Sequence, residues 1–445
     1  MLKKILIANR GEIAVRIIRA CREMGIRTVA IYSEADKEAL HTKLADEAIC
    51  IGPASSNKSY LNIKAILEAI CLTGSDSVHP GFGFLSENVT FAKMCEEIGI
   101  KFIGPNYKLI ELLGNKSKAK ETMKKVGVPV VPGSEGIIKS KKEAVELAEK
   151  IKYPVILKAS AGGGGRGIRV AYSKAELEKE YDIVRQEAKV SFNDDSIYIE
   201  KFIENPRHIE IQVLADEKGN CIHLGERDCS IQRRNQKVLE ETPSQILNEE
   251  TRKEMGEIAV KAVKKIGYSN AGTIEFLVDK NKDFYFMEMN TRVQVEHPVT
   301  EMVTGVDIIK EQIKIASGEN LSYKQEEIEI KGHSMEVRIN AENPEKNFMP
   351  APGMITGLHL PGGNGIRVDT AIYDGYNVPP TYDSMLAKLI VYGKNREESI
   401  LKMRSALSET VIEGITTNID FLLKILKNKD FQDNNYDTSF IAKHF

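Results

Sequence analysis

The sequence predicts a protein of mixed α/β and α+β class that contains more than one domain. Its 445 residues exceed what one hydrophobic core normally supports, and its 42% apolar and 28% charged content is ordinary for a globular protein. Two patterns indicate the class. Strand and helix signals alternate over residues 3–110, whereas strand signals dominate much of the chain after residue 203.

The first part of the chain predicts a parallel sheet with helices on both faces. An apolar run at 4–8 precedes apolar residues at helical spacing over 12–24 and a β-branched run at 28–32. This βαβ rhythm resembles a nucleotide-binding half-domain, but its first turn contains only Gly11 and lacks the G-x-G-x-x-G fingerprint. We therefore expect a scaffold that contacts substrate rather than an NAD site.

Changes in composition mark the remaining parts. Residues 79–88 predict a Gly-punctuated turn that either borders a cleft or is a plain structural loop. Residues 127–136, rich in Val, Pro and Gly, predict a hinge into a second unit. A third portion begins near residue 203, with strands expected near 209–215, 221–225, 272–279 and 284–290. The last part predicts strands near 334–341 and 385–392 and helices at 397–409 and 418–427.

A glycine-rich loop between two apolar strands predicts a lid over phosphates. A helix at 140–151 leads into a strand at 153–159, then Ser-Ala-Gly-Gly-Gly-Gly-Arg-Gly at 160–167 and a strand at 168–171. The loop formally fits G-x-G-x-x-G, but a strand follows it and the Gly-Lys-Ser/Thr of a P-loop is missing. Glycines let backbone N–H groups approach phosphate oxygens, and Lys158 would add a positive charge. The alternative is a flexible linker.

Polar residues at every second position predict a metal and anion site. If strand geometry continues, one face of the chain carries Glu288, Asn290, Arg292, Gln294 and Glu296, with Met289, Thr291, Val293 and Val295 between them. Carboxylate and amide oxygens suit Mg²⁺, and a nearby guanidinium could hold a planar anion. The alternative is an exposed polar face on an edge strand. It disagrees with the apolar Phe-Tyr-Phe-Met that comes just before.

A second acid completes the predicted metal site. Glu275 lies in the apolar run Gly-Thr-Ile-Glu-Phe, where an unpaired charge would be costly. Residues 279–283 predict a hairpin turn towards Glu288, so two antiparallel strands could face both carboxylates toward the same ions. The alternative is structural salt bridging of each acid to Arg or Lys.

Charge and cysteine usage exclude several classes of protein. Lys and Arg number 62 against 64 acidic residues, and no block of one sign occurs, so neither a nucleic-acid nor a membrane partner is expected. No run approaches the roughly 18 apolar residues of a membrane span, and the first residues lack the features of an export signal. The six cysteines are scattered without a Cys-x-x-Cys pair, which favours a reduced, cytoplasmic enzyme.

A glycine lid over ATP beside paired acids resembles the ATP-grasp fold, and five motifs together resemble biotin carboxylase. They are Asn-Arg-Gly-Glu-Ile-Ala at 9–14, the 79–88 turn, the glycine lid, Glu-Arg-Asp-Cys-Ser-Ile-Gln-Arg-Arg at 226–234, and residues 288–298. The likeness runs from residue 1 to about residue 440. It implies a Rossmann-like domain at 1–114, an ATP-grasp domain at 115–330 with a mobile lid at about 131–203, and a C-terminal mixed α/β domain at 331–445.

The resemblance implies ATP- and bicarbonate-dependent carboxylation of biotin through carboxyphosphate, as in the first half-reaction of acetyl-CoA carboxylase in fatty-acid synthesis. It implies ATP and two Mg²⁺ (or Mn²⁺) as cofactors. Since the chain has no Met-Lys-Met biotinylation sequence, biotin should be carried by a separate biotin carboxyl carrier protein. Carboxyltransferase subunits and a second copy of the chain are further implied partners. Arg16 and Arg19, on the exposed side of the first helix, and Arg367 are candidate residues of that homodimer interface.

The resemblance also implies roles for individual residues. The ATP phosphates would be held by Lys116, Lys158, Gly164 and Gly165, and adenine by Glu200, Lys201, Phe202 and Ile203. Other nucleotide contacts would come from His208, Gln232, Asn235, Glu275 and Glu288, and the metals from Glu275, Glu288 and Asn290. Bicarbonate would be held by Lys237, Arg292, Gln294 and the Val295 backbone. Glu296 would be the general base, and Arg338 would stabilise the biotin enolate.

Three positions depart from the family pattern: Asn235 stands where His is usual, Phe82 replaces Tyr, and Ala161 replaces Gly at the lid entrance. Cys229 is interpreted as a packed thiol. Two rival functions remain open. One is a related ligase that forms another acyl phosphate, such as carbamoyl phosphate. The other is a non-catalytic ATP-binding regulatory subunit.

Overall fold

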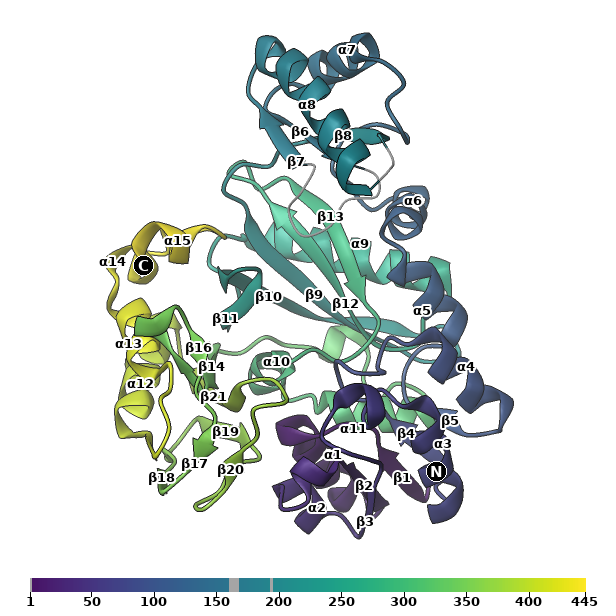
Figure 1. The fold of residues 1–445 in the computed structure, drawn as a ribbon, viewed down its shortest axis with the longest axis vertical. Coiled ribbons are helices and arrows are strands. Elements are labelled where there is room, and N and C mark those ends of the chain that lie inside the picture. The colour runs from purple at the N-terminus through teal and green to yellow at the C-terminus, as the bar shows by residue number, and fades with distance from the viewer. Residues whose placement is uncertain (1, 160–167, 193–194) are drawn as a thin grey trace. The chain divides into compact units, whose positions relative to one another are not determined.

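The computed structural model describes residues 2–159, 168–192 and 195–445, which form two compact units (Figure 1). Unit 1 comprises Met1–Val128, Arg207–Phe276 and Glu288–Phe445. Unit 2 comprises Pro129–Pro206 and Leu277–Met287. The change of composition expected at 127–136 coincides with the start of unit 2. The domain boundaries at 114 and 330 stay a prediction.

Unit 1 begins with the parallel sheet that the βαβ rhythm predicted, flanked by helices (Figure 1). The strand order is β3-β2-β1-β4-β5, with β1 Lys4–Ile7, β2 Arg27–Tyr32, β3 Glu47–Cys50, β4 Ser77–His79 and β5 Lys101–Phe102. Ile5 and Ile7 pack into the core that contains helix α1, whereas Leu6 packs into the core on the other face. Alternate side chains of one strand thus serve two cores, which explains its continuous apolar run. The helices of this part are α1 Gly11–Glu23, α2 Leu40–Leu44, α3 Ile63–Thr73, α4 Val89–Glu97, α5 Tyr107–Gly114 and α6 Lys116–Val126.

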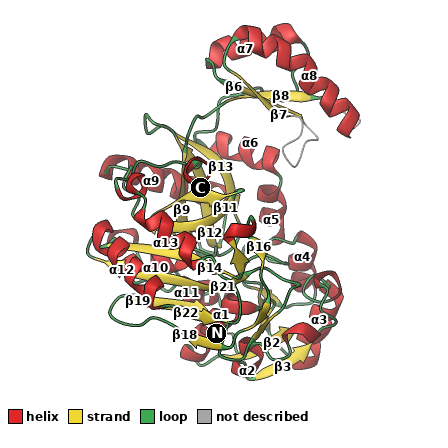
Figure 2. Cartoon of the chain, turned by 60° about the vertical axis from the view of Figure 1, so that its left-hand side comes forward, coloured by secondary structure: helices red, strands yellow, loops and turns green. Residues whose placement is uncertain are grey.

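Unit 2 contains a three-stranded antiparallel sheet of order β7-β6-β8. Its strands are β6 Val155–Ala159, β7 Ile168–Ala171 and β8 Ile197–Lys201, and helices α7 Lys141–Ile151 and α8 Lys174–Phe192 pack on one face (Figure 2). Strands β6 and β7 pair with Lys158 opposite Ile168, which confirms a hairpin around the glycine-rich run. The run itself, residues 160–167, lies outside the described residues.

The largest sheet has eight strands in the order β13-β12-β9-β10-β11-β14-β21-β19. Its strands are β9 Arg207–Ala215, β10 Cys221–Arg233, β11 Gln236–Thr242, β12 Asn270–Val278, β13 Phe284–Asn290, β14 His333–Asn340, β19 Ile366–Thr370 and β21 Met385–Gly393. All six strands that the sequence predicted after residue 203 are present. Strand β10, however, continues well past residue 225. A register shift between His223 and Glu226, where Gly225 has φ +81°, interrupts the alternation that the sequence would show.

Strand β11 was not predicted, because its tight connection to β10 carries no Gly or Pro. Arg234 and Asn235 form a two-residue turn, with φ of +50° and +64°. Two left-handed residues are typical of the hairpin turns that match strand twist, and Asn tolerates this conformation well. The turn therefore explains why Asn suits position 235 and fixes where β11 begins.

Helices pack on the eight-stranded sheet, both on β9 and β10 and on the strands nearer the C-terminus. Helix α9, Glu249–Ile266, packs on β9 and β10, and α10, His297–Thr304, packs across β10, β11, β14 and β21. Helices α12, Arg396–Glu409, and α13, Ile419–Lys427, match the predicted spans and pack on the C-terminal strands. The remaining elements are α11 Ile308–Ala316, α14 Lys429–Gln432, α15 Phe440–His444, β15 Glu342–Asn343, β16 Met349–Pro350, β17 Gly353–Met354, β18 Gly357–His359, β20 Asn377–Val378 and β22 Val411–Glu413. Among the described residues, no helix is both long and apolar enough to cross a membrane.

The expectation that strand geometry continues from 288 to 296 is wrong. Strand β13 ends at Asn290, the next residues form turns, and α10 begins at His297 with Pro298 in its first turn. Val293 and Gln294 are both buried, so no two-residue alternation of exposure exists here. Proline is favoured in a first helical turn, and the helix must cross the sheet, so the chain leaves the strand direction.

Candidate active site

Lys237 on β11 is surrounded by buried carboxylates. Its Nζ donates to Oε2 of Glu210 at 2.6 Å, to Oε1 of Glu275 at 3.1 Å and to Oε1 of Glu296 at 2.5 Å. Burial would lower the pKa of Lys237, but Cys229 and these three carboxylates raise it well above its ordinary value. A permanently cationic ammonium thus holds three strands and the start of α10 together at one point.

Alternation along β9 supplies part of this polar face. His208, Glu210 and Gln212 recur at every second position and are buried, with Ile209 and Ile211 between them. The sequence analysis singled out His208 alone, although the same pattern of alternating polar residues was visible for all three. Alternation places their side chains on one face of the sheet. Buried polar groups in such number require partners, and each has one.

Arg227 on β10 supplies a second buried cation, which the sequence analysis did not single out. It is fully buried, and its guanidinium donates to Glu210 at 2.5 Å, to Gln212 at 2.8 Å and to Oε1 of Gln294 at 2.8 Å. The fixed fork of an arginine orients each acceptor. Arg227 therefore fixes both the acid beside Lys237 and the amide of Gln294.

Glu275 is the shared acceptor on the metal side of the site. Its Oε1 accepts from the amides of Asn290 and Gln294, each at 2.8 Å, and its Oε2 lies 2.9 Å from Nε2 of His208. Burial would raise the pKa of Glu275, but Lys237 and His208 lower it below its ordinary value. Glu275 is therefore a carboxylate anion at neutral pH.

The predicted metal ligands are compatible with a divalent cation. Asn290 contacts Glu275, and Glu288 lies two residues earlier on β13, so strand alternation turns Glu288 and Asn290 to the same side. Oε2 of Glu288 lies 3.4 Å from Nζ of Lys116, a residue predicted to bind phosphate. The donor set consists of carboxylate and amide oxygens, which Mg²⁺ prefers. His208, Glu210 and Glu275 form a second group whose ligand atoms lie within 4.8 Å of one another.

Arg292 connects the site to the 79–88 turn. Its Nε donates to Oε2 of Glu87 at 3.0 Å and its Nη2 to Oδ1 of Asn290 at 2.9 Å. The other oxygen of Glu87 accepts from the backbone of Thr291 at 3.0 Å. The turn therefore contacts residues of the candidate site, which favours the first of its two interpretations. Glu87 was quoted in the motif, but its pairing with Arg292 depends on a contact 205 residues apart along the chain.

Arg338 contacts the oxygen of Glu296 that Lys237 does not contact. Nη2 of Arg338 donates to Oε2 of Glu296 at 3.1 Å, and its Nε donates to Glu240 at 2.8 Å. Burial would raise the pKa of Glu296, but Lys237, Arg338 and Arg227 hold it well below its ordinary value. Glu240, with fewer cations beside it, has its pKa raised to about 7 by burial, against the effect of Arg338. The sequence analysis missed Glu240.

Gln232 and Cys229 lie close to this cluster, whereas Asn235 is exposed in the β10–β11 turn. Nε2 of Gln232 contacts Nδ1 of His208 at 2.6 Å. Cys229 is buried, as expected of a packed thiol, and burial raises its pKa well above the ordinary value. Its Sγ lies 3.9 Å from Oε1 of Glu296, a neighbour that the sequence did not reveal.

Unit 2 carries the residues predicted to contact adenine and some of the residues predicted to contact the phosphates. Nζ of Lys158 donates to Oε2 of Glu200 at 2.6 Å across the β6–β8 pair. Lys201 donates instead to backbone carbonyls of residues 152 and 153, and the backbone of Phe202 donates to Pro154. Ile203 is buried. Gly164 and Gly165 lie outside the described residues.

The predicted interface arginines differ in exposure. Arg19 is exposed, but Arg16 is buried, so the expectation that both lie on an exposed face is wrong for Arg16. Arg16 donates to Glu301 at 2.9 Å and Arg367 donates to the same carboxylate at 2.7 Å. The reason is tertiary, because Glu301 on α10 and Asp307, which precedes α11, both accept from Arg16.

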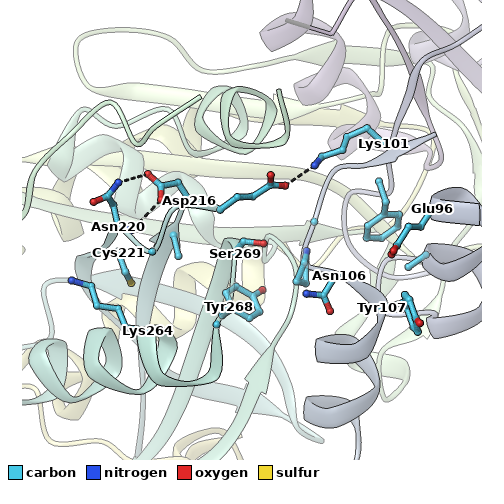
Figure 3. Close-up of a pocket in the computed structure, with 18 of the residues that line it drawn as sticks. Glu96, Lys101, Asn106, Tyr107, Asp216, Asn220, Cys221, Lys264, Tyr268 and Ser269 are labelled. Atoms are coloured by element: carbon cyan, nitrogen blue, oxygen red, sulfur yellow. Dashed lines mark hydrogen bonds and ion pairs between the residues drawn. The ribbon is translucent and has the colours of Figure 1, made fainter. Parts of the chain in front are cut away.

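A separate pocket of about 440 Å³ lies elsewhere in unit 1 (Figure 3). It is enclosed by α4, β5, the start of α5, the β9–β10 connection and the end of α9. Lys101 and Glu217 form an ion pair of 2.5 Å at its edge, and Asp216 accepts from Asn220. None of the predicted site residues lines this pocket, so it belongs to a different part of the molecule.

An antiparallel sheet with converging buried acids and cations, together with a second small sheet that brackets a glycine-rich run, defines the class of ATP-grasp ligases. The comparisons with known proteins agree. A model described as "Biotin carboxylase, N-terminal domain" matches residues 1–110, and "Biotin carboxylase C-terminal domain" matches 336–443. Between them, "Carbamoyl-phosphate synthase L chain, ATP binding domain" matches 115–324.

Relatives match over the whole length of the chain. Biotin carboxylase 1 of Bacillus subtilis is 61% identical over 445 residues, covering 100% of this chain and 99% of the relative. The biotin carboxylase–β,γ-ATP complex from Campylobacter jejuni is similar with a TM-score of 0.91 at 53% identity, covering 100% and 99% of the two chains. The biotin carboxylase domain dimer of Hydrogenobacter thermophilus 2-oxoglutarate carboxylase, in complex with MgADP, ADP and bicarbonate, has a TM-score of 0.89 at 54% identity, covering 100% and 98%.

The chain belongs to the biotin carboxylase family. This confirms the resemblance, the fold class and the enzyme class inferred from the sequence, that of a ligase whose activity is the ATP-dependent carboxylation of biotin.

Proposed function

We propose that the chain carboxylates biotin on a separate biotin carboxyl carrier protein, using ATP and bicarbonate through carboxyphosphate. The observation that carries this proposal is the carboxylate of Glu296, which is held by Lys237 on one oxygen and by Arg338 on the other. The predicted bicarbonate ligand, the predicted base and the predicted biotin residue are thus in direct contact. A ligase that only makes an acyl phosphate has no need of Arg338, the predicted biotin residue.

The bicarbonate step uses cations that already surround the base. Lys237, Arg292, Gln294 and the backbone of Val295 would hold the anion. Glu296 is ionised, so it can accept the proton of bicarbonate. A bound anion would compete with Glu296 for Lys237. Losing part of that interaction raises the pKa of a carboxylate, so substrate binding would strengthen the base.

The phosphoryl step requires charge compensation around ATP. Lys116 lies beside Glu288 at the edge of the acid cluster, where it would hold phosphate oxygens. Glu275, Glu288 and Asn290 would hold a divalent cation, which would supply positive charge to offset that of the phosphates. We assign that role to two Mg²⁺ or Mn²⁺ ions, and the MgADP bound to the Hydrogenobacter relative supports magnesium. The nucleotide roles of Lys158, of residues 200–203 and of the lid glycines are part of the same proposal.

The carboxyl transfer step places biotin beside Arg338. Carboxyphosphate breaks down to CO₂ and phosphate, and biotin must lose its weakly acidic ureido proton to accept CO₂. The charge that develops on the ureido oxygen requires a positioned donor. Arg338 is fixed by Glu240 and Glu296 and carries N–H groups for this purpose. Released phosphate is the candidate base for the ureido proton.

The partners follow from the same chemistry. We infer a homodimer, which is supported by the dimer described for the Hydrogenobacter protein, with Arg19 and Arg367 as candidate interface residues. Carboxyltransferase subunits would receive the carboxyl group, with acetyl-CoA as the acceptor in fatty-acid synthesis in the cytoplasm.

The test is a turnover assay with ATP, Mg²⁺, bicarbonate and free biotin. We expect phosphate release to depend on bicarbonate, to rise with biotin, and to be accompanied by carboxybiotin. ATP cleavage that ignores biotin and yields carbamoyl phosphate with ammonia would favour the related ligase. No phosphate release under any combination of substrates would favour the regulatory subunit.

A further inference from the structure

We propose that Lys388 is a positioning residue of this active site, which fixes the peptide between Val295 and Glu296. Lys388 lies on β21 and its side chain is fully buried. Nothing in the sequence motifs singled it out. The proposal rests on the proposed function, because it concerns the bicarbonate ligand Val295 and the base Glu296.

The contact is a direct hydrogen bond to the catalytic turn. Nζ of Lys388 donates to the carbonyl oxygen of Val295 at 2.9 Å. That oxygen belongs to the same planar peptide as the N–H of Glu296, so anchoring it fixes the orientation of the whole group. Lys388 also lies opposite Arg338 in the β14–β21 pair. A single lysine thereby connects β21, the strand paired with the one that carries Arg338, to the turn that carries the proposed base.

Two carboxylates keep the buried ammonium in place. Nζ lies 3.2 Å from Oε2 of Glu12 on α1 and 3.9 Å from Oδ2 of Asp369 on β19. A buried ammonium without partners would cost several kcal/mol, so its position is confined to the point where all three acceptors meet. Helix α1 and strand β19 therefore determine where the Val295 carbonyl is held.

The turn needs such an anchor because it is not regular structure. Residues between Asn290 and His297 lack the hydrogen-bond ladder of a strand, and Glu296 itself precedes α10 with φ −83° and ψ +11°. A misplacement of about 1 Å in a reacting group can cost on the order of 100-fold in rate. The ammonium therefore contributes to the geometry of bicarbonate binding without touching the substrate.

The obvious variant, Lys388→Met, would leave Glu12 as an uncompensated buried acid and so confuse stability with activity. The double variant Lys388→Met/Glu12→Gln removes both charges. Asp369 keeps its two hydrogen bonds from Arg367, at 2.9 and 2.7 Å. The double variant therefore removes the hydrogen bond to Val295 without leaving Glu12 or Asp369 as an unpaired charge. Glu12→Gln alone is the matched control.

The measurement is initial rate against bicarbonate and against ATP, with free biotin, together with the thermal unfolding midpoint. For the double variant we expect KM for bicarbonate to rise about tenfold or more, while KM for ATP changes less than about twofold and the Tm stays near that of Glu12→Gln. Glu12→Gln keeps Lys388 and a side-chain oxygen that can accept from it, so its KM for bicarbonate should rise at least about fivefold less than that of the double variant.

Three results would overturn the proposal. One is a folded double variant with a wild-type KM for bicarbonate. Another is an equal rise in both KM values. The third is a double variant that does not fold, which would assign Lys388 to core stability. A wild-type protein without bicarbonate-dependent turnover would instead refute the proposed function itself, and with it the role assigned here.

Discussion

Nζ of Lys237 lies 2.5 Å from Oε1 of Glu296, so the carboxylate proposed as the base is paired with a neighbouring cation in this structure. This relationship links substrate binding to the strength of the base. An anion that draws Lys237 away leaves the carboxylate with Arg338 and Arg227 and raises its pKa. On the proposed assignment, Glu296 stays ionised at neutral pH and becomes a stronger base only when bicarbonate binds.

Lys237 is expected to be the most sensitive cation of the site. Lys237→Met leaves Glu210, Glu275 and Glu296 without their shared cation, so bicarbonate would meet a more negative cluster and lose one proposed ligand. We expect kcat/KM for bicarbonate to fall by about 100-fold or more. Lys253→Met is the matched control, since that lysine is 76% exposed. A fall of less than about threefold for Lys237→Met would contradict this assignment.

Arg338 should separate the two halves of the reaction. In Arg338→Gln the fork that faces biotin is lost, whereas Lys237 still holds Glu296. We expect carboxybiotin formation to fall by about 100-fold, with a much smaller change in bicarbonate-dependent ATP cleavage without biotin. Arg27→Gln, at an exposed position paired with Glu47, is the control. Equal losses in both assays would place Arg338 in the phosphoryl step instead.

The metal assignment predicts a changed requirement for Mg²⁺. Glu288→Gln removes one carboxylate oxygen ligand but keeps the shape of the side chain. We expect the Mg²⁺ concentration for half-maximal rate to rise about tenfold, with partial recovery of the rate at high Mg²⁺. Glu257→Gln, on an exposed helix face, should leave the requirement unchanged. An unchanged requirement in Glu288→Gln would remove Glu288 from the metal site.

Two buried histidines are expected to make unit 1 less stable in acid. Burial lowers the pKa of His79 to about 3 and that of His41 to about 4. Because both values lie below the ordinary value of 6.5, the unfolded chain binds the proton more tightly. The stabilisation is complete above pH 6.5 and is lost as the pH falls toward the folded pKa. Each histidine should therefore cost about 2 kcal/mol between pH 6.5 and pH 5.

Urea unfolding at pH 7 and pH 5 checks this prediction. His79→Asn keeps an acceptor for the backbone N–H of Gly81, which now donates to Nδ1 of His79 at 3.1 Å. The variant should lose about 2 kcal/mol of the pH dependence. His359→Asn, at an exposed position, should retain all of it. An unaltered difference between the two pH values in His79→Asn would show that this histidine does not control acid stability.

Local patterns explain what the sequence could predict. The apolar run of β1 and the helical spacing of α1 are set by neighbours a few residues away, and both appear in the structure. The two strands around the glycine-rich run pair as expected, because only residues 160–167 separate them along the chain. Glu275 and Asn290 come together because β12 and β13 are joined by a short turn.

Long-range packing explains what the sequence could not predict. Glu87 meets Arg292, and Lys388 meets Val295, across 205 and 93 residues of chain. No spacing rule connects such pairs. The end of β13 at Asn290 was missed because polar residues continue to alternate beyond it. Their spacing there does not reflect a strand backbone. Glu210 is a different case, because the alternation of polar residues along β9 could have identified it as a site residue.

The measurement that tests the central claim most directly is carboxybiotin formation by Glu296→Gln with ATP, Mg²⁺, bicarbonate and free biotin. The amide keeps the shape of the side chain and can still contact Arg338, but it cannot accept the proton of bicarbonate. Carboxybiotin formation should fall by about 1000-fold, a loss within the range that general base catalysis supplies, while ATP still binds. Carboxybiotin formed at the wild-type rate by Glu296→Gln would contradict the assignment of Glu296 as the base and the mechanism built on it.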